Sequence, residues 1–120
     1  LKPKDRAISN NLAFFAFISG REERLAEQIA RENYSANPRN ETAVATHAFI
    51  LSQTGRAAEA VAILKPFAER IPASPSLAFA QGFALAGIGR KDEARQLLEK
   101  LPPETQTARE DELIAAALNP

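Results

Sequence analysis

The sequence predicts an all-α domain made of three consecutive helical hairpins and a terminal helix. Two observations carry this prediction: the chain resembles itself at an offset of about 34 residues, and the apolar residues of each copy recur at helical spacing rather than in alternation. A glycine also separates the two helical patterns of each copy, where a left-handed residue ends one helix. We expect one domain over residues 1–120, with repeats at about residues 6–40, 41–74 and 75–103 and a terminal helix at about residues 105–118.

The internal repeat is clearest between the second and third copies. Residues 53–60 superimpose on residues 87–94, and large apolar residues fall on large apolar residues on both sides of this match. These pairs are Phe49 with Phe83, Leu51 with Leu85 and Leu64 with Leu98. In the first copy, Ala26 aligns with Ala60 at the same offset, whereas Gly20 needs one residue more to reach Gly55. Turns tolerate such differences in length.

The helices of the first two hairpins follow from their apolar stripes and their proline and glycine residues. In the first hairpin an uncharged helix ends at Gly20. Its second helix carries the stripe Leu25, Ala26, Ile29 and Ala30. In the second hairpin the stripe of the second helix runs from Ala57 to Ile71, and Pro66 within it predicts a kink because proline lacks a backbone donor. Pro38 and Pro72 are expected to close these second helices.

The third hairpin begins at Ser74-Pro75, a pattern typical of an N-cap followed by a first-turn proline. Its second helix carries the stripe Ala94, Leu97, Leu98 and Leu101 and stops early at Pro102-Pro103. The terminal helix is predicted from a capping box over residues 107–110. A short apolar stripe follows, formed by Leu113, Ile114, Ala117 and Leu118. This helix is either a cap on the end of the stack or the truncated start of a fourth repeat.

The residues at matching positions of the copies resemble the tetratricopeptide repeat (TPR) family. Copy two supplies Val44, His47, Ala48, Leu51, Gly55, Ala60, Leu64, Phe67 and Pro72, and copy three supplies Ala78, Gln81, Gly82, Leu85, Gly89, Ala94, Leu98 and Leu101. Copy one supplies Leu12, Ala13, Gly20, Ala26 and Pro38. The resemblance covers about residues 6–103, with departures at His47, where the pattern has Leu, and at Ala16, where it has a large residue. It implies a right-handed superhelix of three TPR-like helical hairpins plus a C-terminal helix.

The first helix of every hairpin lies in a stretch without charge. All fifteen Lys and Arg and all fifteen Asp and Glu lie outside residues 7–20, 42–55 and 71–89. A helix without a charged face is usually covered on more than one side. In the TPR family the first helices line the concave surface that holds a bound segment, so the resemblance places one set of residues on a groove. These are Asn10, Phe14, Phe17, Ala45, Phe49, Ser52, Phe79, Phe83 and Ala86.

Two interpretations of the phenylalanines are open at this point. In the first, Phe14, Phe49 and Phe83 form an aromatic row that receives an apolar or amphipathic segment of a partner. In the second, the rings fill the space between hairpins, as aromatic stripes at helical spacing often do. The first interpretation predicts a folded protein without partner binding when Phe49 and Phe83 are replaced by Ser, and the second predicts unfolding.

Several other functions are disfavoured by the composition. The formal net charge is zero, and the first helices carry no Lys or Arg, so we expect neither the carboxylate clamp known in TPR proteins nor nucleic-acid binding. The chain has no Cys and one His, which excludes thiolate chemistry and argues against a metal site. His47 is expected to be buried or half-buried with one hydrogen bond. We expect no enzymatic activity, no cofactor and no membrane span.

The sequence therefore predicts a protein–protein interaction module. The partner would be a protein or peptide, a second copy in a homodimer, or the rest of the parent chain, because the absence of any Met indicates a piece of a longer protein. Two alternatives stay open: a structural or self-assembly segment of a longer TPR-containing protein, and a regulatory domain attached to an enzyme. Nothing in the sequence indicates a cellular location.

Overall fold

The computed structural model describes residues 3–102 and 108–118, and its regular structure there is entirely helical. The helices are α1 (Pro3–Ile18), α2 (Glu23–Ala36), α3 (Glu41–Gln53), α4 (Ala57–Leu64), η1 (Lys65–Phe67), η2 (Ile71–Ala73), α5 (Pro75–Gly87), α6 (Lys91–Leu98) and α7 (Ala108–Leu118). The all-α prediction is confirmed, and the described part of the predicted terminal helix is α7. Residues 105–107 of that prediction, and with them the start of the capping box, lie outside the described residues.

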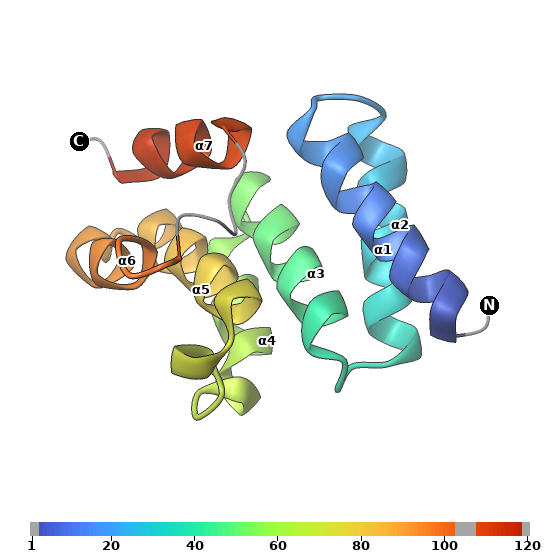
Figure 1. Ribbon diagram of the computed structural model, residues 1–120, viewed down its shortest axis with the longest axis horizontal. Helices are drawn as coiled ribbons and strands as arrows, with labels where there is room; N and C mark the ends of the chain where they lie inside the picture. Colours follow the sequence, from blue (N-terminus) through green and yellow to red (C-terminus); the bar gives the residue numbers. More distant parts are fainter. Residues whose placement is uncertain (1–2, 103–107, 119–120) are drawn as a thin grey trace.

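Three helical hairpins follow one another across the molecule (Figure 1). The pairs α1–α2, α3–α4 and α5–α6 each pack together, and neighbouring hairpins meet through α1, α3 and α5 and through the contacts of α2 with α3 and α4 with α5. Each of the three turns contains a glycine with positive φ, at Gly20, Gly55 and Gly89. Because L-residues rarely adopt this conformation, glycine is what lets each chain segment reverse at these points.

The starts of the helices repeat at the same offset as the sequence. The Asn40 side chain accepts a hydrogen bond from the Ala43 amide at the start of α3. Ser74 accepts one from the Leu77 amide at the start of α5, as predicted for an N-cap. The second helices α4 and α6 also begin with matching ion pairs, Arg56–Glu59 and Arg90–Glu93. These ion pairs are exposed and contribute little to the stability of the fold. They are evidence of the repeat because they recur at the same offset.

The second helix of the middle hairpin differs from the prediction. It ends at Leu64 instead of kinking at Pro66 and continuing to Ile71, and η1 and η2 replace its last turns. Lys65 still has helical backbone angles, but Pro66 has no N–H to donate to the preceding turn, so the α-helical bonding pattern is lost there and the chain continues as 3-10 turns. Pro72 accordingly lies inside η2, beyond the end of the helix that it was expected to close.

The core is built mainly from the charge-free stretches of α3 and α5. Eight residues of α3 and eight of α5 are buried, because α3 lies between the other two hairpins and α5 between α3 and α6. The helix α1 has a neighbour on fewer sides, and Ile8, Leu12 and Phe15 on it are about half exposed or more. The uncharged stretches therefore indicate deep burial correctly in the second and third hairpins and only partly in the first.

Candidate functional site

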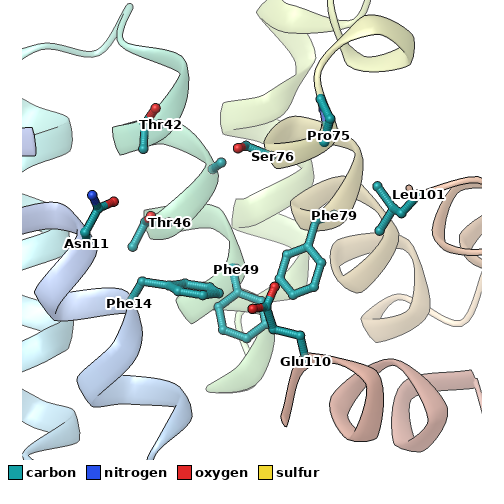
Figure 2. Close-up of a pocket in the computed structure, with 11 residues that line it drawn as sticks. Asn11, Phe14, Thr42, Thr46, Phe49, Pro75, Ser76, Phe79, Leu101 and Glu110 are labelled. Atoms are coloured by element: carbon teal, nitrogen blue, oxygen red, sulfur yellow. The ribbon is translucent and has the colours of Figure 1, made fainter. Parts of the chain in front are cut away.

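A pocket of about 180 Å³ opens where α1, α3 and α5 meet. Phe14 of α1, Phe49 of α3 and Phe79 of α5 form its aromatic wall (Figure 2). The remaining lining residues are Asn11, Thr42, Ala45, Thr46, Pro75, Ser76, Leu101 and Glu110. All but Leu101 and Glu110 come from the three first helices, which is where the sequence placed a binding surface.

The aromatic wall is a contact network rather than a single row. The ring centroid of Phe49 lies 5.4 Å from that of Phe14, 5.3 Å from Phe79 and 5.1 Å from Phe83. Phe17 also contacts it at 6.0 Å, edge to face. Such tilted and edge-on pairs are the stable arrangement of aromatic rings. Phe49 is thus the centre of the cluster, and it is almost wholly buried, with 1 % of its surface exposed.

The nine residues expected on the groove fall into two groups. Those that line the pocket are Phe14, Ala45, Phe49 and Phe79. The other five lie elsewhere. Phe83 is buried behind the pocket wall, and Phe17 is half-buried beside Phe49. Ser52 donates a hydrogen bond to the Ala48 carbonyl within its own helix, and Ala86 is half-buried against the core.

Asn10 lies inside the interface between α1 and α3. Its Nδ2 donates to Thr46 Oγ1 at 3.0 Å and to the Thr42 carbonyl at 3.5 Å, and the residue is 3 % exposed. The neighbouring Asn11 lines the pocket in its place. Successive residues of a helix point about 100° apart. Asn10 is therefore buried against α3, whereas Asn11 lies on the pocket wall.

The polar rim of the pocket was not predicted, although the repeat indicates part of it. Thr42 and Ser76 are related by the same offset of about 34 residues that relates the hairpins, and both line the pocket. Asn11 aligns with Thr46 at the longer offset of the first copy. Each of these two repeat positions is thus polar in two of the three copies and alanine in the third, Ala7 in copy one and Ala80 in copy three. Glu110 of α7 is the only charged residue among the lining residues described.

His47 lies apart from the pocket, on the side of α3 that packs against α2. Its ring stacks on Tyr34 with centroids 5.0 Å apart, and Nδ1 is buried without a hydrogen-bond partner among the described residues. The expected hydrogen bond is therefore not made at Nδ1. Burial lowers the pKa of the imidazole, and the positive charges of Arg56 and Arg31 lower it further. The lowered pKa favours the neutral imidazole, and the ring packs against Tyr34.

Two other kinds of site are not found in the described part of the chain. Residues 3–102 and 108–118 contain no group of three or more His, Asp or Glu side chains placed to hold a metal ion. In the same residues no helix combines the length and the apolar character needed to cross a bilayer.

Comparison of the chain with family models, with curated proteins and with solved structures gives no match. The pocket and its neighbours are accordingly interpreted from their own chemistry. The described lining residues offer apolar surface, neutral hydrogen-bonding groups and one carboxylate, and they include neither a nucleophile beside a base nor a pair of carboxylates.

Proposed function

We propose that this chain is a TPR-like right-handed superhelix that acts as a protein-interaction module, and that it holds an apolar side chain of a partner segment in the pocket between α1, α3 and α5. The observation that supports this proposal is the position of the pocket. It lies where the charge-free stretches of the three first helices meet, with Phe14, Phe49 and Phe79 as its wall and small polar residues at its rim.

The size of the pocket indicates what it holds. An apolar cavity of about 150 Å³ takes up one benzene molecule in a well-studied protein, so about 180 Å³ matches one aromatic or leucine-sized side chain. Complete burial of such a side chain contributes about 1.5–3 kcal/mol, whereas micromolar binding requires about 8 kcal/mol. The side chain would therefore orient the partner, and the rest of the affinity would come from contacts of its main chain and flanking residues.

Selection from a random peptide library tests the proposal without knowledge of the natural partner. Selected peptides should share one large apolar residue, and Ala45→Met, which fills the pocket from its wall, should weaken their binding at least tenfold. Ala62→Met on the exposed side of α4 is the matched control and should bind as the unchanged protein does. Peptides that bind Ala45→Met with unchanged affinity, while its amide NMR spectrum shows a native fold, would contradict the proposal.

A second function, stacking on another copy or on a further hairpin, is favoured by an apolar stripe on the outer side of the first hairpin. Ile8, Leu12 and Phe15 form this stripe on α1 and are 52 %, 64 % and 52 % exposed. At the offset of the first copy, Leu12 corresponds to His47, which α2 covers with Tyr34. The stripe is therefore the face that a preceding second helix would cover.

Light scattering tests this second function on the chain alone. Self-association through the stripe predicts a mass above 13.0 kDa that returns to that of one chain in Leu12→Arg. If the protein is a monomer at all concentrations, the proposal of self-assembly through this face is wrong. The proposal of an interaction module is not affected by that result.

A further inference from the structure

The second and third hairpins differ at one place in the repeat. In the second hairpin, the Tyr34 ring of α2 stacks on the His47 ring of α3, with an angle of 27° between the ring planes. The same two positions in the next copy, 34 residues later, hold Ala68 and Gln81. Neither of these side chains has a ring, so the third hairpin lacks the stacked pair that fills this place in the second.

An open pocket lies at this place in the third hairpin. It has a volume of about 670 Å³ and lies between η2, α5 and α6, and both Ala68 and Gln81 line it. Ala68 is exposed and Gln81 is half-buried. The place that a tyrosine ring fills in one hairpin is therefore open to solvent in the next. We call this space the third-hairpin pocket.

The third-hairpin pocket has an apolar floor and a polar edge. Ile71, Leu85 and Leu101 line it and are 7 %, 4 % and 8 % exposed. Gln96 and Lys100 also line it and are exposed. Pockets that bind ligands commonly combine apolar walls with a few polar groups, and their volumes are about 300–1,000 Å³. The third-hairpin pocket has this composition and this size.

The charges at the edge favour an acidic group on the ligand. The charged residues among the described lining are Glu93 and Lys100. Arg90 holds the Glu93 carboxylate at 2.6 Å, so the charge of this glutamate is already balanced within α6 and its cap. The Lys100 ammonium therefore leaves the edge of the pocket with an excess of positive charge.

We infer that the third-hairpin pocket binds an aromatic side chain of a partner polypeptide, in the place that Tyr34 takes in the second hairpin, with an acidic residue of the partner beside Lys100. The Gln81 side chain ends in a flat amide, on which a ring can stack as Tyr34 stacks on His47. A cavity of about 150 Å³ takes up one benzene molecule, so about 670 Å³ holds a ring and part of the segment that carries it.

This inference does not rest on the proposed function. Only Pro75 and Leu101 belong to the described lining of both the aromatic pocket and the third-hairpin pocket. The residues that would contact the ring, Ala68 and Gln81, belong to the third-hairpin pocket alone. Each pocket can therefore be blocked by a substitution that leaves the other one open.

A small probe, p-cresol, tests the aromatic site by NMR on the whole chain, because it is the side chain of tyrosine. It should shift the backbone amide signals of Ala68 and Gln81 in a saturable way. Its saturated counterpart, 4-methylcyclohexanol, is not flat and should bind more weakly by a factor of about 3 or more. Equal affinities of the two probes, or p-cresol shifts confined to Ala45 and Thr46 at the aromatic pocket, would overturn the inference.

Ala68→Tyr supplies from the chain itself the ring that Tyr34 supplies in the second hairpin. It should abolish the p-cresol shift at Gln81 and unfold at the same or a higher temperature, because the new ring covers apolar surface of the open pocket. The matched control is Ala58→Tyr, which is exposed on α4 and outside the described lining, and it should bind p-cresol as the unchanged protein does. Unchanged p-cresol binding in Ala68→Tyr would overturn the inference.

Peptides selected from a random library on Ala45→Met, in which the aromatic pocket is filled, identify the chemistry of the partner separately from the proposed function. They should carry Tyr, Phe or Trp next to Asp or Glu. Their affinity for Ala45→Met should fall at least tenfold when Ala68→Tyr is added, and less when Lys100→Glu is added, because exposed charge pairs contribute little. Selected peptides without an aromatic residue, or with an affinity that Ala68→Tyr does not change, would overturn the inference.

Light scattering distinguishes a separate partner from a second copy of this chain. A second copy would offer the ring of Phe15, which is 52 % exposed on α1. We expect Ala68→Tyr to leave the measured mass unchanged. A mass above 13.0 kDa that falls to that of one chain in Ala68→Tyr would assign the pocket to a second copy and overturn the inference of a separate partner.

Discussion

Arg109 of α7 donates a hydrogen bond from Nε to the carbonyl oxygen of Ile18 at the end of α1, across 91 residues of sequence. The last carbonyls of a helix have no partner inside it, and a cation there also interacts favourably with the helix dipole. At its other end, α7 receives a hydrogen bond from Arg95 to the Leu118 carbonyl. The terminal helix is thus connected to the first and to the last hairpin.

This connection predicts a local effect of Arg109→Ala. The side chain is half exposed, so its loss should lower the free energy of unfolding by only about 1 kcal/mol. Amide hydrogen exchange should become faster in α7 and at the end of α1, and stay unchanged in α3 and α5. Arg24→Ala, on the exposed side of α2, is the control. Faster exchange throughout the molecule would show that the contact supports the whole fold instead.

Gly82 marks the closest approach of α5 and α6. A Cβ atom added there would lie 2.5 Å from Cγ and Cδ2 of Leu98. Gly82→Ala should therefore lower the free energy of unfolding by about 1–3 kcal/mol through overpacking. In a background that carries Leu98→Ala the added methyl group has room, and the same substitution should cost clearly less. Urea unfolding of the four proteins gives this coupling, and additive effects would contradict the packing described.

The pKa of His47 predicts how stability changes with pH. Burial, followed by Arg56 and Arg31, lowers this pKa in the folded protein below its ordinary value of 6.5. The unfolded chain therefore takes up a proton at higher pH than the folded one. The contribution of His47 is fully present above pH 6.5 and is lost as pH falls towards the folded pKa.

Urea unfolding at pH values from about 7.5 down to about 5 measures this contribution. His47→Leu should be less sensitive to pH over that range, since leucine does not titrate. Leucine is also the residue that the TPR pattern has at this position, and it should pack against Tyr34 without an unpaired nitrogen. An identical pH dependence of the two proteins would show that His47 has an ordinary pKa in the folded state.

Local signals in the sequence predicted most of the hairpin architecture. Glycine at a left-handed position, a Ser74 N-cap and apolar residues at helical spacing each act within one or two turns. The glycines and the N-cap are found where they were expected, whereas Leu25 of the predicted stripe on α2 is 48 % exposed. The end of α4 at Leu64 was not predicted, because the stripe continues through Phe67 and Ile71. Those side chains pack on the core from 3-10 segments, which the spacing of apolar residues does not distinguish from a continued helix.

The candidate site was predicted less completely, because it depends on how the helices pack against one another. Spacing along one helix assigns Asn10 and Phe14 to one face, but the depth to which α3 covers that face depends on how two helices pack. Asn10 is covered and bonded to Thr46, whereas Phe14 remains half-buried at the pocket. The contribution of Glu110 depends on the position of α7, which no repeat position specifies.

The burial of the phenylalanines changes what their substitution is expected to show. Phe49 and Phe83 are 1 % and 2 % exposed, and large-to-small replacement of a buried phenylalanine costs about 3–5 kcal/mol. Two such changes together amount to about 6–10 kcal/mol, comparable to the whole stability of an ordinary domain. The double Ser variant should therefore unfold whether or not the pocket binds a partner. Far-UV circular dichroism at about 25 °C shows whether the double variant keeps its helices.

Phe14→Ser separates packing from binding at the same pocket. This ring is half-buried and contacts Phe49 from α1, the helix with neighbours on fewer sides, so its loss should cost less than that of Phe49. We expect a folded protein with a lower unfolding midpoint and with weaker binding of peptides selected on the unchanged chain. If Phe14→Ser were as destabilised as Phe49→Ser, the aromatic wall would be a single packing unit closed to ligands. If it folded and bound the selected peptides unchanged, their apolar residue would lie outside this pocket.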